Sequence, residues 1–205
     1  MLLIVDYDLG NIGSLLNMFK KIGIQDVLIS SFPEDIKKAD KLVLPGVGAF
    51  DNGMKNLKEL GLISLLNDMV LEKQKPILGV CLGMQLFTKA SEEGVLEGLS
   101  WIDATTRRFN FENNGENLRV PHMGWNTVKV SRPSPLLHGI DETSRFYFVH
   151  SYRVVCNHRE DVLLETHYGM DFTSAFHKNN IYGVQFHPEK SHRFGMQLLE
   201  NFSRI

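Results

Sequence analysis

Short apolar runs alternate with amphipathic segments along the first 90 residues. The runs predict strands at residues 2–5, 27–29, 41–44 and 76–80, and apolar positions at helical spacing predict helices over 14–22, 54–72 and 84–90. The run at 76–80 is apolar throughout, as expected for a strand buried on both faces of a parallel sheet. The first half of the chain therefore has a βαβ pattern.

Shorter β-like pieces replace this pattern after residue 99. They lie at 127–130, 146–149, 162–166 and 181–187, with a turn predicted at 178–180 and a last helix over 191–202. No repeat or linker divides the sequence. We therefore expect one domain, residues 1–205, of the α/β class: a mostly parallel sheet flanked by helices, with an antiparallel extension.

Composition excludes several classes of protein. The 22 Lys and Arg residues against 24 Asp and Glu residues give a net charge of −2, which argues against a strongly basic nucleic-acid-binding protein. No apolar run approaches the roughly 20 residues needed to span a bilayer, and Asp6 interrupts the apolar start before a secretory signal could form. We expect a cytoplasmic protein that binds neither nucleic acid nor a membrane.

Cys81 and Cys156 have no partners at zinc-ligand spacing, so we expect no metal and no cofactor.

Cys81 lies between two glycines in the segment Gly79-Val80-Cys81-Leu82-Gly83, where a buried strand must give way to a helix. Glycines on both sides permit a tight turn that lifts the thiol out of the sheet, as in a nucleophile elbow. The N-terminus of the following helix would favour a thiolate and an oxyanion. A small buried cysteine within a strand is an equally good interpretation of this pentapeptide alone.

The tripeptide His187-Pro188-Glu189 favours the catalytic interpretation. Residues two apart in an extended segment point to the same side, so the imidazole and the carboxylate can lie next to each other, and Pro188 is expected to end the strand there. A thiol nucleophile needs a base, and the base needs an acceptor that fixes its tautomer. The sequence predicts Cys81, His187 and Glu189 in these three roles. In the alternative, His187 caps a strand end and Glu189 is a solvated charge.

The loop Pro45-Gly46-Val47-Gly48 follows the strand at 41–44 and is expected at the carboxyl edge of the sheet. It lacks the lysine and the spacing of a phosphate-binding loop. The N–H groups of Val47 and Leu82 are candidates for the two halves of an oxyanion hole; the alternative is a flexible connection. Because Gly46 and Gly48 permit more than one peptide orientation, we hypothesise that Val47 N–H points away at rest and that a partner turns it inward.

Taken together, these residues resemble the triad-type glutamine amidotransferases, which have a flavodoxin-like architecture and hydrolyse glutamine with a cysteine elbow and a distant His-x-Glu. Further segments resemble the glutaminase subunits of imidazole glycerol phosphate synthase, and the likeness covers nearly the whole chain. They are Pro45-Gly46-Val47-Gly48-Ala49-Phe50, Pro121-His122-Met123-Gly124-Trp125-Asn126, Phe148-Val149-His150-Ser151-Tyr152 and His187-Pro188-Glu189-Lys190-Ser191.

The resemblance implies that the Cys81 thiolate attacks the side-chain amide of glutamine and that His187 protonates the departing ammonia. It also implies a set of residues that bind glutamine. Those positions are Gly48, Gln85, His150, Ser151 and Tyr152. For two of them other interpretations stay open, namely Tyr152 as a core residue and Gln85 as a helix-surface residue.

A partner follows from the chemistry of the product. Ammonia released into neutral water becomes ammonium, which has no lone pair for attack, so it needs a sheltered path. The resemblance implies a heterodimer with a (β/α)8-barrel cyclase that makes imidazole glycerol phosphate and aminoimidazole carboxamide ribotide in histidine biosynthesis. It places Asn11, Trp125 and Lys190 near the interface. A turn asparagine, a core tryptophan and a surface lysine are the alternatives.

Two positions depart from the family pattern. Asp8 stands where the family usually has glycine, and His192 stands where the histidine-pathway subunit more often has glutamine. A second hypothesis is therefore a paralogous glutaminase subunit that supplies ammonia to a sugar-modifying amidotransferase in surface polysaccharide synthesis. A different cysteine hydrolase and a catalytically silent interaction module remain as functions of other classes.

Overall fold

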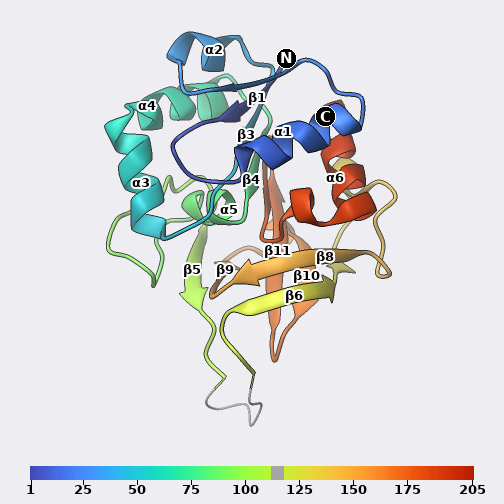
Figure 1. Ribbon diagram of the computed structural model, residues 1–205. Helices are drawn as coiled ribbons and strands as arrows, with labels where there is room; N and C mark the ends of the chain where they lie inside the picture. The colour runs from blue at the N-terminus through green and yellow to red at the C-terminus, as the bar shows by residue number, and fades with distance from the viewer. Residues whose placement is uncertain (112–117) are drawn as a thin grey trace.

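The computed structural model describes residues 1–111 and 118–205 and is built around a ten-stranded sheet. Five neighbouring strands of this sheet run parallel in the order β2-β1-β3-β4-β12 (Figure 1). Their bounds are Leu2–Val5 (β1), Val27–Ser30 (β2), Lys41–Leu44 (β3), Ile77–Val80 (β4) and Ile181–Val184 (β12).

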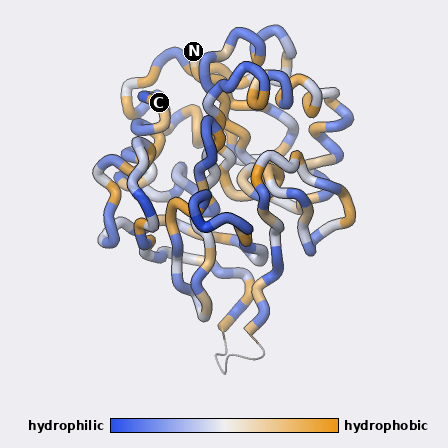
Figure 2. The backbone as a smooth tube through the Cα atoms, turned by 180° about the vertical axis from the view of Figure 1, so that it is seen from behind, coloured by the Kyte–Doolittle hydropathy of each residue, from blue (hydrophilic) through white to orange (hydrophobic). Residues whose placement is uncertain are grey.

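Helices cover both faces of the parallel strands, because successive side chains of a strand point to opposite sides. Leu2 and Ile4 pack in one core with α1 and α6, whereas Leu3 and Val5 pack in a second core with α2 to α5 (Figure 1). The helices along the outside alternate hydrophilic and hydrophobic residues (Figure 2). Their bounds are Ile12–Lys21 (α1), Pro33–Lys38 (α2), Phe50–Glu59 (α3), Leu62–Asn67 (α4), Leu82–Leu86 (α5) and His192–Arg204 (α6).

The sheet continues beyond β12 as antiparallel strands. β11 pairs with β12, β10 and β9, β10 also pairs with β7, and β9 also pairs with β5. A separate antiparallel pair, β6 and β8, lies against β10. The bounds are Ala104–Arg108 (β5), His122–Thr127 (β6), Lys129–Val130 (β7), Arg145–His150 (β8), Tyr152–Cys156 (β9), Val162–His167 (β10) and Asp171–Lys178 (β11).

The predicted α/β class, with a parallel centre and an antiparallel extension, is confirmed. The predicted helix over 54–72 is wrong in one respect, because the chain breaks at Gly61, whose φ of +67° is a left-handed conformation that glycine adopts at little cost. α3 and α4 lie before and after this break, and a π-helical turn, Asp68–Glu72, follows α4. The predicted strand over 181–187 ends as a strand at Val184.

Three shorter elements complete the described chain. They are the 3-10 turns η2 (Pro135–Leu137), η3 (Arg159–Asp161) and η4 (Pro188–Lys190). Among the described residues, no helix combines the length and the apolar character needed to cross a membrane.

Gly83 shows how closely α5 packs on β3. A Cβ atom at this position would lie 1.9 Å from the carbonyl oxygen of Leu44, and a backbone atom cannot give way as a flexible side chain can. We expect Gly83→Ala to lower the free energy of unfolding by about 3 kcal/mol or more, as severe overpacking does. The measurement is chemical denaturation of the purified variants.

Gly13→Ala is the matched control, because Gly13 lies in α1 and a Cβ there would meet no atom of another described element within 4 Å. Removing a helical glycine should leave stability unchanged or raise it by up to about 1 kcal/mol. Equal stability of the two variants would show that the close approach of α5 to β3 does not constrain the fold.

Candidate active site

Cys81 occupies a sharp turn between β4 and α5. Its φ of 55° and ψ of −109° are a strained conformation for a residue with a side chain, and its N–H donates to Val184 O at 2.8 Å. The flanking glycines are required on steric grounds: a Cβ at Gly79 would lie 2.7 Å from the backbone nitrogen of Met84. The structure thus has the elbow geometry that the Gly-x-Cys-x-Gly spacing predicts.

His187 and Glu189 form a buried pair beyond the end of β12. Nδ1 of His187 lies 2.8 Å from Oε1 of Glu189, and each side chain is only 2% exposed. Three hydrogen bonds hold the backbone here: His187 N–H donates to Tyr147 O, the Ser191 hydroxyl donates to His187 O, and Tyr147 N–H donates to Ser191 Oγ. Because the carboxylate only accepts, Nδ1 carries a proton and Nε2 is the atom available for chemistry.

The surroundings of His187 favour its protonated form. Burial acts to lower the pKa of His187, but hydrogen bonding to Cys81 and Glu189, together with their negative charges, raises that pKa to about 10. Nε2 has no well-aligned hydrogen bond within residues 1–111 and 118–205, although the thiol is close enough to influence the ring. The site thus stabilises the imidazolium form of His187 next to the Cys81 side chain.

A cavity of about 370 Å³ contains the thiol of Cys81 and the imidazole of His187. Every residue that was predicted to bind substrate or an oxyanion also lines it. These residues are Val47, Gly48, Leu82, Gln85, His150, Ser151 and Tyr152. The structure therefore brings the predicted residues to one place, although they come from separate parts of the chain.

Glu93 also lines this cavity and was missed in the sequence. Its Oε2 accepts the N–H of Phe50 at the start of α3 at 2.8 Å, and its own N–H donates to Ser91 Oγ. It is the one carboxylate in the cavity lining of the described residues. No local pattern marks Glu93, because it is one of two adjacent acidic residues in a loop.

Gln85 is buried, so its interpretation as a helix-surface residue is wrong. Its side-chain N–H group donates to Gln185 Oε1 at 2.9 Å and to Tyr152 O at 3.2 Å. Gln185, also missed in the sequence, places its amide nitrogen 3.7 Å from Cys81 Sγ. A hydrogen-bond network thus connects the cavity wall with the thiol.

The loop Pro45-Gly46-Val47-Gly48 has a closed arrangement. Leu82 N–H donates to Gly46 O at 3.3 Å, so one of the two candidate oxyanion donors is occupied. In a planar trans peptide the C=O and the N–H point in opposite directions, so Val47 N–H points away from Leu82. This is the orientation hypothesised for the resting loop.

Tyr7 holds the same loop in place from the interior of the protein. Its ring is fully buried, and its hydroxyl donates to Pro45 O at 2.5 Å. Burial, with a smaller contribution from the charge of Cys81, raises the pKa of Tyr7 well above its usual value, so the phenol keeps its proton. A Cβ at Gly46 would lie 2.5 Å from this hydroxyl, which explains the glycine.

The predicted interface residues are exposed. Trp125 is 45% exposed and stacks on His192 with ring centroids 5.4 Å apart, so its interpretation as a core residue is wrong. Lys190 Nζ lies 5.8 Å from the centre of the Tyr147 ring, which in turn contacts Trp125. Asn11 is exposed just before α1, a helix that packs against η4.

Both departures from the family pattern lie at residues with a positive φ. Asp8 has a φ of 63° and His192 a φ of 47°, a left-handed conformation that favours glycine. A glycine at position 8 would therefore suit the turn, and aspartate is among the residues that tolerate it. His192 stacks on Trp125, so this departure lies on the exposed aromatic surface.

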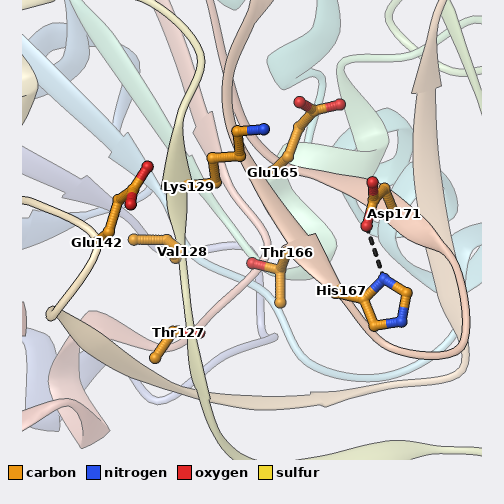
Figure 3. Close-up of a pocket in the computed structure, with 8 residues that line it drawn as sticks. All are labelled: Thr127, Val128, Lys129, Glu142, Glu165, Thr166, His167 and Asp171. Carbon is orange, nitrogen blue, oxygen red and sulfur yellow. Dashed lines mark hydrogen bonds and ion pairs between the residues drawn. The ribbon is translucent and has the colours of Figure 1, made fainter.

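A second cavity, of about 470 Å³, lies beside the β10–β11 hairpin (Figure 3). His167 and Asp171 form an exposed pair at 2.7 Å there, and Glu142 lies across from them. This cavity contains no thiol and none of the predicted site residues. Its lining consists of Thr127, Val128, Lys129, Glu142, Glu165, Thr166, His167 and Asp171.

Comparisons with known proteins point to one family. The sequence model of the family "Glutamine amidotransferase class-I" matches residues 3–205. The chain is 56% identical over 202 residues to imidazole glycerol phosphate synthase subunit HisH 2 of Methanococcus maripaludis, covering 98% of each chain. It is 50% identical over 205 residues to subunit HisH 2 of Pseudomonas aeruginosa, covering all of both.

One solved structure illustrates the shared fold. The glutaminase domain of the Trypanosoma brucei protein CTPS, determined with bound acivicin, matches with a TM-score of 0.66. The match covers 99% of this chain and 93% of that one at 17% identity, and so shows similarity of fold alone.

The raised pKa of His187 predicts how stability depends on pH. Because the folded state favours the imidazolium, the ion pair's contribution is fully present below the ordinary pKa of 6.5 and is lost as the pH rises through about 10. We expect Glu189→Gln to destabilise the protein most near pH 6 and least near pH 10. Urea denaturation at several pH values measures this difference.

The matched control is Glu160→Gln, which removes one of the acidic partners of an exposed histidine, His158, at 3.8 Å. An exposed pair of this kind contributes little, so the stability loss should be small at every pH. If Glu189→Gln lowered the free energy of unfolding equally at pH 6 and pH 10, this result would contradict the buried ion pair.

Proposed function

The chain belongs to the glutamine amidotransferase class-I family, and from this premise we propose that it is the glutaminase subunit of a two-subunit synthase. In this proposal it hydrolyses glutamine to glutamate and ammonia in histidine biosynthesis, and the ammonia passes to a cyclase subunit. The observation that carries the proposal is that a strained cysteine elbow and a carboxylate-bound histidine line one cavity.

Each catalytic residue has a distinct role in the proposed reaction. The thiolate of Cys81 attacks the side-chain carbonyl carbon of glutamine, and His187 donates its Nε2 proton to the departing ammonia. A thioester between Cys81 and the glutamyl group remains. His187, now neutral, takes a proton from water, which attacks the thioester and releases glutamate. Glu189 holds the ring in the required orientation throughout.

The resting loop must change before the oxyanion is stabilised. Rotation of the peptide between Gly46 and Val47 would break the 3.3 Å hydrogen bond to Leu82 N–H and turn Val47 N–H inward. Both N–H groups would then face the developing negative charge. Gly48, with a φ of +113° that glycine adopts at little cost, is the proposed second hinge for this rotation. Partner binding is the proposed trigger, which would keep glutamine from being hydrolysed when no acceptor is present.

Glu93 is the proposed acceptor for the α-ammonium group of glutamine. A free amino acid carries this positive charge, and Glu93 supplies the one carboxylate in the described cavity lining. Its hydrogen bond to Phe50 N–H holds the carboxylate in place. Gln85 and the segment Ser151–Tyr152 form the neighbouring wall.

The proposed partner is a cyclase of the (β/α)8-barrel type, forming a heterodimer. The outward side of β6 carries two exposed apolar side chains, Met123 at 61% and Trp125 at 45% exposure. Lys190 and Asn11 are exposed on neighbouring elements. An apolar surface beside the active-site loops suits a partner that receives ammonia without releasing it into water.

A second partner is favoured by the two departures from the family pattern. His192 contacts Trp125 on the proposed interface, and Asp8 replaces a glycine three residues before Asn11. Changes at an interface alter which partner fits. The second candidate is therefore a paralogous glutaminase that supplies a sugar-modifying amidotransferase in surface polysaccharide synthesis.

Glutamate release by the purified chain tests the proposal. We expect slow release by the chain alone and at least about 100-fold faster release in the complex, because one oxyanion-hole donor contributes about that factor. Cys81→Ser should abolish release in the complex. The assay is run with the barrel cyclase and with the sugar-modifying amidotransferase, each with its acceptor, and the partner that stimulates release identifies the pathway.

Two results would contradict the proposal. One is the absence of glutamate release with either partner, and the other is equal release by Cys81→Ser and the wild type. Equal rates for the isolated chain and the complex would contradict only the loop switch.

Glu93→Gln tests the substrate-binding role. The amide keeps the hydrogen bond to Phe50 but removes the charge, so we expect KM for glutamine to rise about 10- to 100-fold, the effect of losing a hydrogen bond between charged groups. Glu97→Gln, a change at an exposed acidic residue outside the cavity, is the control and should leave KM unchanged. Equal KM values for both variants would exclude Glu93 from glutamine recognition.

A further inference from the structure

Two histidines outside the catalytic triad form a direct buried pair. His122 of β6 lies opposite His150 of β8 in the strand register, and both side chains are less than 7% exposed. Nδ1 of His122 lies 3.0 Å from Nε2 of His150. Only one of these two nitrogens can donate, so the pair requires a defined arrangement of protons.

The partners at both ends of the pair define the direction of the hydrogen bonds. At one end, Nδ1 of His150 lies 2.7 Å from Tyr152 O, which only accepts. At the other end, the amide of Asn126 is oriented by two further bonds, from Thr127 N–H to its oxygen and from its nitrogen to His167 O. Its nitrogen therefore donates to His122 Nε2, at 3.3 Å.

These two constraints agree on one pattern. Asn126 donates to Nε2 of His122, Nδ1 of His122 donates to Nε2 of His150, and Nδ1 of His150 donates to Tyr152 O. Each ring then carries a single proton, on Nδ1, and is uncharged. Free neutral histidine favours the proton on Nε2, so the surroundings impose the less common form on both rings.

The aromatic environment keeps both rings neutral. The ring of His122 stacks between Tyr168 and Phe148, with centroids 4.1 and 4.8 Å away, and Phe172 contacts both histidines. Burial lowers the pKa of His122 to about 4 and that of His150 to about 3. A protonated ring would place two N–H groups face to face or leave a charge among apolar rings.

The chain of hydrogen bonds ends at the glutamine cavity. Tyr152 O accepts from His150 and also from Gln85, and Gln85 bonds to Gln185 beside the thiol. His150, Ser151 and Tyr152 line the cavity, whereas His122 does not. The direct hydrogen bond between the two rings thus connects His122 to the cavity through His150.

We propose that His122 is a positioning residue for glutamine: through neutral His150 it holds the Tyr152 carbonyl, and with it Gln85 and the cavity wall formed by Ser151 and Tyr152. The inference rests on the proposed glutaminase function, whose residues it extends. A purely structural role for His122 would require only a flat ring between Tyr168 and Phe148, whereas the positioning role requires an N–H donor aimed at His150.

Two substitutions at position 122 distinguish these roles, because each role predicts the opposite order of glutamine affinity for the two variants. His122→Phe keeps a ring for the aromatic stack but has no donor, and His122→Asn loses the ring but places an amide nitrogen where Nδ1 was. Affinity for glutamine is measured as Kd by calorimetry in the Cys81→Ser background, which does not hydrolyse it. KM and kcat are measured with the active complex.

We expect His122→Phe to raise Kd and KM about tenfold, corresponding to one lost hydrogen bond, while kcat changes less. His122→Asn should restore Kd to within about threefold of the wild type even if its Tm is lower. The opposite ranking, or equal affinities in all three proteins, would overturn the positioning role. Glutamine binding with this pattern but without glutamate release would overturn the proposed function and leave the positioning role supported.

The proton positions give an independent readout that needs neither partner nor turnover. Long-range ¹H–¹⁵N spectra of the isolated chain at neutral pH distinguish the two neutral forms of each imidazole. We expect the Nδ1–H form for both His122 and His150. The His122 signals are assigned as those that disappear from the spectra of the variants at position 122. The Nε2–H form at either residue, or a charged ring, would overturn the arrangement.

Discussion

The left-handed backbone of Cys81 is the constraint on which the rest of the site depends. A side chain in this conformation is unfavourable, and it persists because β4 is held between β3 and β12 while α5 packs against the end of β3. Gly83 and Gly79 leave room for that packing. The turn raises the thiol above the sheet edge, and the parallel neighbour β12 brings Gln185 and His187 to the same edge although they lie more than 100 positions later in the chain.

Two groups of titratable side chains lie close together, and their surroundings favour opposite charge states: a protonated ring at His187 and neutral rings at His122 and His150. His187 has a carboxylate on one side and the thiol on the other, so its protonated form is favoured despite burial. His122 and His150 are buried among aromatic rings, and within residues 1–111 and 118–205 neither has an acidic partner, so burial keeps both neutral. The charged pair suits proton transfer, and the neutral pair suits the directed hydrogen bonds that position a binding site.

Features encoded by neighbouring residues were predictable from the sequence. The five parallel strands follow from apolar runs, and the elbow and the His-Pro-Glu pair follow from local spacing, so the positions of Cys81, His187 and Glu189 near the loop Pro45-Gly46-Val47-Gly48 were predictable. The break at Gly61 was missed because a single glycine within a helical pattern does not reveal its backbone angles. Glu93, Gln185 and the donor role of His122 depend on contacts between distant segments, which spacing along the chain does not contain. The same limit explains why Gln85 and Trp125 could not be assigned to interior or surface.

Selective modification of the thiol at the elbow tests most directly whether this arrangement is a glutamine-hydrolysing site. A chloroketone analogue of glutamine is incubated with the protein, and the modified peptides are identified by mass spectrometry with and without excess glutamine. We expect modification of Cys81, prevented by glutamine and strongly slowed in His187→Asn. Cys156 should remain unmodified, because burial raises its pKa to about 12. Equal modification of both cysteines, or labelling of Cys81 that neither glutamine nor the histidine substitution affects, would contradict a nucleophile activated for glutamine.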